Sequence, residues 1–447
     1  MLFVSTSYAQ QPIRILAENT TLTGTGSNLP FWFTANRDGK VMDSGSWLNL
    51  TDLYAGQSYS STGSAVAFTW AANAVAGFGQ TNYYQLNLAY GGISWKGWEV
   101  KGGLFYEPTL YAGLSSTNGN LVRSRNARPH PRVRFATRGY KPVPFLHDLL
   151  FRAEYDEGLL NDNRFVENAR LHHKSLYLRM HLSSTWEVEC GLDHYVMWGG
   201  TSREERIGKM PAGFKEYLQY VLGRSGTGAF PPGDQLNVAG NHLGSYTLRA
   251  KKRFTGMDAT FYLSHPFEDL SGMNWRNWPD NLLGLYAGFH NSRQIITGVV
   301  YEYTHTRQQS IRGRWDRQEP DSYFNNSVYQ SGFIYHRQTM GSPLFFPVMV
   351  LEGISQGMAS NMLQAHHVGV KGVLPPHLRW KGMLTWIHHF GRYFNRYEPS
   401  RQQLSALLEV QYARRGLPVD LGMAAAADAG NASGRNLGLQ FRISKTW

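Results

Sequence analysis

The chain has 447 residues, of which 42% are hydrophobic and 14% aromatic. Its 44 Lys and Arg residues exceed its 32 Asp and Glu residues, which gives a formal charge of +12 and leaves nucleic acid, anionic lipid or an acidic polymer as partners. No run approaches the roughly 18 consecutive apolar residues of a membrane-spanning helix, so that class of membrane protein is excluded.

The first residues resemble the end of a secretory signal. A short apolar piece precedes Ser7-Tyr8-Ala9, a small-x-small cleavage site, but the usual basic region before it is missing. We therefore expect a signal-peptide remnant at residues 1–9 and an exported protein, which makes nucleic acid the weakest of the three partners. No cysteine stands directly after the cleavage site, so a lipoprotein is not expected. The single cysteine, Cys190, cannot form an intrachain disulfide.

Hydrophobic and polar residues alternate along most of the chain. Residues 10–60 contain two apolar clusters, Leu29–Phe33 and Trp47–Leu50, which predict either a plug or the first strands. From Ser64 onward the period is two, as in Val66, Phe68 and Trp70. Sixteen such segments can be counted, and together they predict strands that are apolar on one face and polar on the other.

The lengths of the connections indicate what these strands build. Short connections such as Trp95–Gly97 and Ser183–Thr185 alternate with long ones such as Tyr195–Asn241 and Thr306–Ala365. Outer-membrane barrels join their strands in this way, with short periplasmic turns and long extracellular loops. We therefore predict an all-β fold, a transmembrane antiparallel β-barrel of 16–18 strands over residues 61–447, with short helices in its loops or plug.

The last strand fits this prediction. In Asn436–Trp447 the residues Leu437, Leu439, Phe441 and Ile443 share one face, and the chain ends on an aromatic residue. On the wall of a barrel that face would contact lipid. By the same alternation Cys190 lies on the lipid side, whereas Glu187, Glu189 and Asp193 line the lumen near Arg179.

One long loop contains a predicted helix. Within Tyr195–Asn241, apolar residues recur at helical spacing from Phe214 to Leu222, and Gly223 follows as a stop. A helix in a loop needs a surface to pack on, so we expect it to fold over or into the mouth of the barrel.

Two other loops carry candidate ligand contacts. Aromatic rings can stack on sugar faces, arginine binds carboxylates, and amides bind hydroxyl groups. The alternative is that these residues only pack the loops against one another. The proposed polysaccharide-binding set is Trp275, Arg276, Trp278, Arg312, Arg314, Trp315, Arg317, Tyr323 and Asn325.

Catalytic and metal-binding patterns are weak. The histidine pairs His172-His173, His366-His367 and His388-His389 would point to opposite faces of their strands, so neither a metal site nor a cofactor is expected. Lumen carboxylates are more often paired with arginine than used for acid–base chemistry. No serine nucleophile elbow is present. We therefore expect no enzyme.

Several segments resemble the Wzi capsule-assembly family of Gram-negative outer membranes. They are residues 30–39, 233–246, 262–280 and 301–310, with the short runs 323–326 and 340–344. The resemblance implies an eighteen-stranded barrel that acts as a lectin and attaches capsular polysaccharide to the cell. The count of sixteen falls two short, and Phe31–Leu53 and Thr306–Ala365 are the places where we expect the missing pair.

Two functions therefore remain. The first is an outer-membrane protein that binds capsular or another acidic surface polysaccharide, with membrane lipid as its other partner and a monomeric state. The alternative is a porin for anionic or sugar solutes, which requires an open lumen. Long loops argue for a closed one.

Overall fold

The computed structural model describes residues 13–42, 45–58, 66–228, 230–231, 235, 238–310, 321–374, 377–414 and 416–447. The expected signal-peptide remnant at 1–9 lies outside this set. Within it the chain is mostly β-strand, and no helix there has both the length and the apolar content to cross a bilayer.

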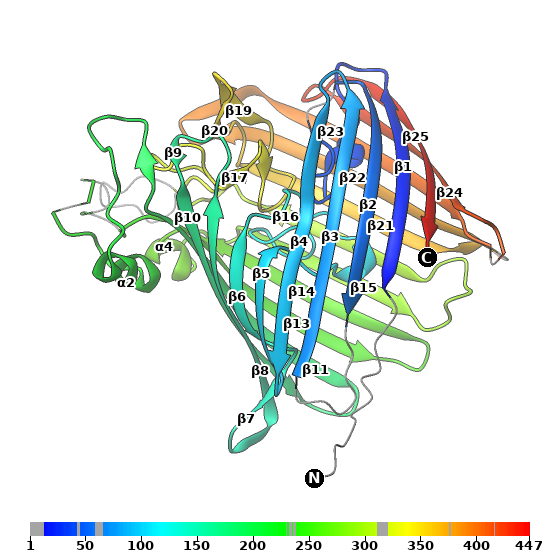
Figure 1. Cartoon of the computed structure of the whole chain (residues 1–447), viewed down its shortest axis with the longest axis horizontal. Helices are drawn as coiled ribbons and strands as arrows, with labels where there is room; N and C mark the ends of the chain where they lie inside the picture. The colour runs from blue at the N-terminus through cyan, green and yellow to red at the C-terminus, as the bar shows by residue number, and fades with distance from the viewer. Residues whose placement is uncertain are drawn as a thin grey trace, which may run out of the picture.

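A single sheet of 19 hydrogen-bonded strands forms the wall (Figure 1). Because β7 continues β6 alongside β8, the wall is a closed antiparallel barrel of 18 strands. The strands are β1 (Arg14–Gly24), β2 (Trp47–Ser58), β3 (Val66–Gly79), β4 (Tyr83–Trp95), β5 (Trp98–Leu104), β6 (Arg132–Thr137), β7 (Lys141–Val143), β8 (Leu146–Leu160), β10 (Ala169–His181), β11 (Trp186–Trp198), β13 (Asn241–Arg253), β14 (Met257–Phe267), β15 (Asn281–Phe289), β16 (Gly298–His305), β21 (Leu363–Leu374), β22 (Leu378–Arg392), β23 (Asn395–Tyr412), β24 (Asp420–Gly430) and β25 (Asn436–Thr446).

The remaining elements lie in the connections. Six short strands pair outside the wall: β9 (Val166–Glu167), β12 (Thr201–Ser202), β17 (Ile334–Tyr335), β18 (Gln338–Thr339), β19 (Val348–Leu351) and β20 (Ile354–Met358). The described helices are α1 (Phe31–Thr34), α2 (Phe214–Leu222), α4 (Leu270–Met273) and a 3₁₀ turn, η1 (Tyr111–Gly113).

The first and last strands close the barrel. β1 pairs with β25 in register, with Asn19 opposite Ile443 and Thr21 opposite Phe441. Beyond the register, Ile15 and Trp447 exchange two backbone hydrogen bonds of 3.2 and 2.9 Å. Closure leaves no free strand edge, which is the condition for a sheet to span a bilayer.

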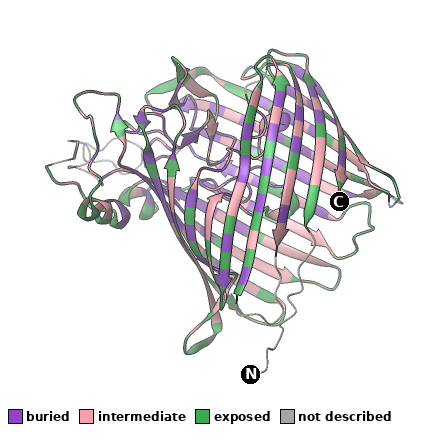
Figure 2. Ribbon diagram, in the orientation of Figure 1, coloured by how far each residue is buried: buried purple, intermediate pink, exposed green. Residues whose placement is uncertain are grey.

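Exposed and buried residues alternate along the strands of the wall, as predicted (Figure 2). On β25, Leu439 is 66% exposed on the outside, whereas Gln440 is 3% exposed on the inside. Cys190 is exposed on the outer face, and the inward Glu189 contacts Arg179. The period of two therefore identified the lipid-facing side correctly.

The connections also alternate as predicted. Two residues join β4 to β5 and four join β10 to β11, whereas residues 306–362 join β16 to β21. β1 begins and β25 ends at the short-turn end, where Ile15 pairs with Trp447. We call the opposite end, which carries the long connections, the loop end.

The two strands missing from the sequence count are β1 and β2. β2 begins inside Phe31–Leu53, but β1 lies upstream of that range. In the described part of Thr306–Ala365, β17 to β20 pair only with each other, so the expectation of a wall strand there is wrong. β1 and β2 were overlooked because polar side chains, among them Asn19, Asn49 and Thr51, interrupt their outer face and bond to one another. Apolar residues such as Ile15 and Leu53 are exposed on that face outside this polar stretch.

The hydrophobic core lies inside the barrel, toward the loop end. Residues 105–131, which we call the inner loop, enter the lumen with Leu114, Leu121 and Val122. The connection 306–362 adds Tyr323, Phe333, Phe345 and other apolar residues to the same cluster. α1 packs against the inner faces of β22, β23 and β24 in a second cluster. Three connections therefore fill the lumen from the loop end.

The connection that contains the predicted helix folds outward and not into the lumen. The predicted helix is α2, and it ends at Gly223, which adopts a left-handed conformation (φ 63°). α2 does not lie over or in the mouth, so that expectation is wrong. Tyr217 and Tyr220 pack on Trp198 of β11, whose ring points outward, and Figure 1 shows the helix beside the wall. The ring of Trp198 points outward near the loop end of β11, and α2 covers it there.

Candidate functional site

An ion network fixes the inner loop to the wall. Glu107 of the loop forms ion pairs with the guanidinium groups of Arg132 (2.7 Å) and Arg134 (3.1 Å), which belong to β6. Arg123 of the loop reaches Glu154 of β8 (2.6 Å) and Asp193 of β11 (3.3 Å). We call these residues, with Asp156 and His173, the inner ion network. It ties the loop to adjacent strands of the wall.

The loop members of the network have shifted pKa values. Burial alone would raise the pKa of Glu107, but Arg123, Arg134 and Arg132 outweigh it and hold this pKa well below its ordinary value. Burial likewise opposes the charge of Arg123, yet Glu107 and Glu154 hold its pKa well above the ordinary value. Both groups therefore stay charged inside the barrel, and their pairing supports the loop.

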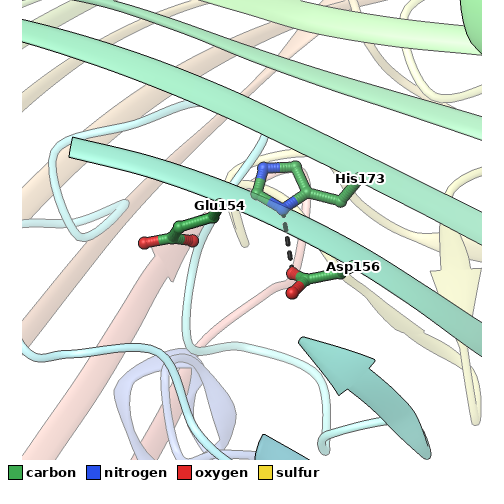
Figure 3. Close-up of side chains that lie close together, drawn as sticks. All are labelled: Glu154, Asp156 and His173. Atoms are coloured by element: carbon green, nitrogen blue, oxygen red, sulfur yellow. Dashed lines mark hydrogen bonds and ion pairs between the residues drawn. The ribbon is translucent and has the colours of Figure 1, made fainter. Parts of the chain in front are cut away.

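Part of the network has the composition of a metal site. Glu154, Asp156 and His173 present ligand atoms within 4.8 Å of one another (Figure 3). However, Arg134 donates hydrogen bonds to both oxygens of Asp156 (2.6 and 2.8 Å), and Arg123 donates one to Glu154. Guanidinium groups already neutralise these carboxylates and would repel a metal ion, so the cluster fits a structural role.

The histidine pairs divide between the two faces of the wall. His173 bonds Asp156 and Asp193 inside, whereas His172 bonds Glu157 on the outer side. His367 contacts the carbonyl of Leu114 in the inner loop at 2.7 Å. His366 bonds the hydroxyl of Tyr301, whereas His388 and His389 bond Ser400 and Ser360. The two rings of each pair therefore have different partners.

The far wall also holds the inner loop. Ser116 donates its backbone N–H to Glu302 of β16 at 2.7 Å, and Tyr111 stacks on Tyr262 of β14 with ring centroids 4.0 Å apart. The loop thus spans the lumen from β8 and β11 to β14, β16 and β21. This arrangement is a plug held from both sides.

A cleft of about 370 Å³ opens where the mouth loops meet the segment around α1. Polar and apolar groups line it together, which is a composition suited to an oligosaccharide. Among them are the exposed Arg337, the amide of Gln338 and the half-buried ring of Phe346, with Asn126 of the inner loop nearby. Sequence reasoning missed this cleft because its residues come from distant connections.

The connection 268–280 presents three of the predicted site residues on the outer side. Trp275 and Trp278 are 41% and 53% exposed, and Arg276 between them is also exposed. The ring of Trp275 lies on His265, an outward residue of β14, with centroids 3.8 Å apart and planes at 13°. We call Trp275, Arg276 and Trp278 the aromatic shelf.

Buried polar residues anchor the shelf from below. Asn277 donates to the backbone carbonyl of Pro266 (2.7 Å) and to the hydroxyl of Tyr323 (2.8 Å). Asp280 accepts from Tyr323 (3.0 Å) and from the backbone of Gln309 (2.7 Å). In the sequence run W-R-N-W-P-D two exposed residues thus precede each buried anchor, and sequence analysis missed the anchoring role of Asn277 and Asp280.

The other predicted site residues lie elsewhere. Tyr323 is fully buried, and burial raises the pKa of its hydroxyl well above the ordinary value. Asn325 is half-buried and bonds the backbone of Met358. Both hold the mouth loop in shape. Arg312, Arg314, Trp315 and Arg317 lie outside the described residues.

Comparisons with known proteins agree with this architecture. A family model described as capsule assembly protein Wzi matches residues 33–346. A solved structure, Wzi of Escherichia coli, has a TM-score of 0.62 at 14% identity, over 96% of this chain and 84% of that one. It is described as an outer membrane protein involved in group 1 capsule assembly and a carbohydrate-binding β-barrel. At that identity the likeness concerns the fold.

Other barrels are less similar. OccK5 of Pseudomonas aeruginosa has a TM-score of 0.49 at 9% identity, with 97% of each chain covered. OccAB2 of Acinetobacter baumannii has a TM-score of 0.49 at 10% identity, also with 97% of each chain covered. No protein with a curated description matches the sequence.

Proposed function

The chain belongs to the Wzi family of capsule assembly proteins, and we propose that it binds a surface polysaccharide at its loop end and so attaches capsule to the cell. The barrel lies in the outer membrane of a Gram-negative bacterium. The solved barrel of Escherichia coli is described as carbohydrate-binding, which supports the proposal.

The rigid and exposed aromatic shelf is the observation that assigns the proposed binding to particular residues. His265 supports Trp275 from behind, and the buried Asn277 and Asp280 anchor the connection that carries it. Such rings can stack on the apolar faces of sugars without further ordering, and Arg276 can pair with a uronate carboxylate. The cleft beside Phe346 provides a second contact for a chain that lies across the closed mouth.

The plugged lumen argues against the porin. Solutes would have to displace the inner loop, whose charged residues pair with both the loop itself and the wall. Breaking one buried partner of such a network costs about 3–5 kcal/mol. A ligand therefore meets the loops and not an open channel.

Binding without cleavage is the corresponding chemical proposal. Glycoside hydrolysis needs one free carboxylic acid and one free carboxylate beside the sugar. Glu154 and Asp156 are already engaged by Arg123 and Arg134 beneath the plug.

The proposal is tested with surface polysaccharide extracted from the source bacterium and immobilised as long chains. Protein in detergent should bind these chains, and the double variant Trp275→Ala/Trp278→Ala should bind at least tenfold more weakly. Phe394→Ala is the matched control, because Phe394 is an exposed aromatic residue (77%) in another hairpin at the loop end. Equal loss in both variants, or no binding by the wild type, would overturn the proposal.

The basic run of the longest connection is a separate contact in the proposal. Arg312, Arg314 and Arg317 surround Trp315 in the sequence, and like charges so close together favour an anionic ligand. Replacing the three arginines with serine should release acidic polysaccharide and reduce the salt dependence of binding. Arg276→Ser should weaken binding to the native chains but not to chains whose carboxylates have been reduced to alcohols.

A further inference from the structure

We propose that α2 lies in the headgroup layer of the outer leaflet and that the cleft beside it accepts an acyl chain of an outer-leaflet lipid. The proposal concerns the outer wall of the barrel and does not depend on polysaccharide binding.

The three faces of α2 differ in character. One face is buried against the barrel through Tyr220 and Val221. Next to it, Phe214, Leu218 and Leu222 recur at intervals of four and are 78%, 41% and 56% exposed. Polar residues, including Lys215 and Gln219, occupy the remaining side. A helix lying flat at a membrane surface has this distribution, with its apolar side toward the acyl chains and its polar side toward water.

The barrel holds α2 in a fixed orientation. The Tyr217 ring packs on Trp198 with centroids 4.9 Å apart, and its hydroxyl donates to Glu157 of β8. Lys174 of β10 donates to the carbonyl of Val221 near the C-terminal end of the helix. The apolar row is therefore presented by an anchored helix.

A cleft of about 720 Å³ lies between α2 and the outer wall. Phe214 and Tyr217 line one side of it, and Val133 of β6 and Leu159 of β8 line the other. Val133 and Leu159 are 57% and 36% exposed, and they point to the same side as the lipid-facing Phe135 and Phe151 on their strands. The cleft thus continues the lipid-facing surface toward the loop end.

Several polar groups of the cleft already have protein partners, although Nε of Arg132 and the indole nitrogen of Trp198 have none. Glu157 accepts from His172 (2.6 Å) and Tyr217, and Arg132 pairs with Glu107 on the inner side. Arg170 lies over the Trp198 ring at 4.6 Å. What remains for an occupant is mostly carbon surface, which suits a hydrocarbon chain better than a sugar or a polar peptide.

The orientation of α2 is tested in a Cys190→Ser background. One nitroxide label is placed at Leu218→Cys. The matched control is a label at Lys215→Cys, which lies one turn earlier on the polar side of the helix. The protein is reconstituted in vesicles of phosphatidylcholine and phosphatidylglycerol. The label at 218 should collide several-fold more with oxygen than with a water-soluble nickel chelate, and the label at 215 should show the reverse. Equal exposure of both labels to the chelate would overturn the proposal.

The cleft is tested with a fluorophore at Val133→Cys and lipids brominated on their acyl chains. Quenching should match that at Leu178→Cys, which lies on the lipid-facing side of β10, and should fall when Phe214 is replaced with aspartate. Heat-modifiable migration on gels confirms that each variant has folded. Quenching at 178 without quenching at 133 would show that no acyl chain enters the cleft.

Discussion

The indole ring of Trp275 lies nearly parallel on the imidazole of His265, with ring centroids 3.8 Å apart. One ring belongs to a loop and the other to a wall strand, so the barrel itself sets the orientation of the proposed sugar-binding surface. A loop ring that is held in this way loses little entropy on binding.

Replacing His265 with alanine should therefore weaken polysaccharide binding without removing any proposed contact. The aromatic pair contributes about 0.5–1.5 kcal/mol, which corresponds to a loss of roughly two- to tenfold. Binding to immobilised chains measures it. His388→Ala is the control, because His388 packs on Phe390 in β22, away from the shelf. Unchanged affinity in His265→Ala would mean that Trp275 is held by other contacts.

Replacing Arg123 with methionine should open the plug intermittently. The change leaves Glu107, Glu154 and Asp193 without a shared guanidinium, at a cost of about 3–5 kcal/mol. In planar bilayers the wild type should carry little steady current, and the variant should show bursts of conductance. Arg206→Met, at a side chain that is 89% exposed, should behave as the wild type. A silent Arg123 variant would count against the network as the lock.

The plug should resist mild acid. The pKa of Glu107 is held well below the ordinary value of 4.5, so its stabilising contribution is fully present above about 4.5 and is lost only as the pH falls through the lower, folded-state value. Currents should therefore stay low at pH 5 and rise in much stronger acid. Glu107→Gln should show current already at neutral pH. Opening of the wild type between pH 6 and 5 would contradict this.

Cys190 should react slowly with a membrane-impermeant thiol reagent in intact vesicles. It lies on the outer face between Leu178 and Leu248 of the neighbouring strands, both 38% exposed, where we expect acyl chains to surround it. Cys190→Arg should cost about 2–4 kcal/mol if the site is near the bilayer midplane. Fast labelling, compared with Lys215→Cys in the loop helix, would place this face in water.

Deleting Trp447 should impair assembly into the membrane while export continues. The residue makes both backbone hydrogen bonds with Ile15 at the seam and ends the strand that closes the wall. Cell fractionation and heat-modifiable migration measure the outcome. Trp95→Ala, an exposed aromatic residue (52%) at the same end of the barrel but away from the seam, should assemble better.

Much of the fold follows from local patterns. Alternation finds a strand wherever the outer side chains are apolar, as in β25, but it fails at β1, where Asn19 and Thr21 face outward beside Asn49. The same rule places polar residues in the lumen. Leu171 and Tyr195 face inward instead, because the inner connections need an apolar surface there. Such inversions depend on contacts between distant segments.

The candidate site was predictable to a similar degree. Composition selected Trp275, Arg276 and Trp278 as candidates, and all three are exposed. Composition could not distinguish these exposed residues from Tyr323, which is also a polar aromatic residue. Tyr323 is fully buried beneath Asn277. The helix α2 was recognised from its spacing, yet its position depends on Trp198, whose outward direction gives no sign that a loop will cover it.

The inner loop has partners over a wide range of distances along the chain, and this range suggests an order of folding. Arg123 bonds to Glu154 and Asp193, which lie 31 and 70 residues further along the chain. Leu114 bonds to His367, which lies 253 residues further along. Short chain closures form sooner, because they sacrifice less chain entropy. The half of the barrel from β5 to β11 can therefore assemble around its own loop first. The later strands then curve around a preformed nucleus, and β25 reaches β1 last.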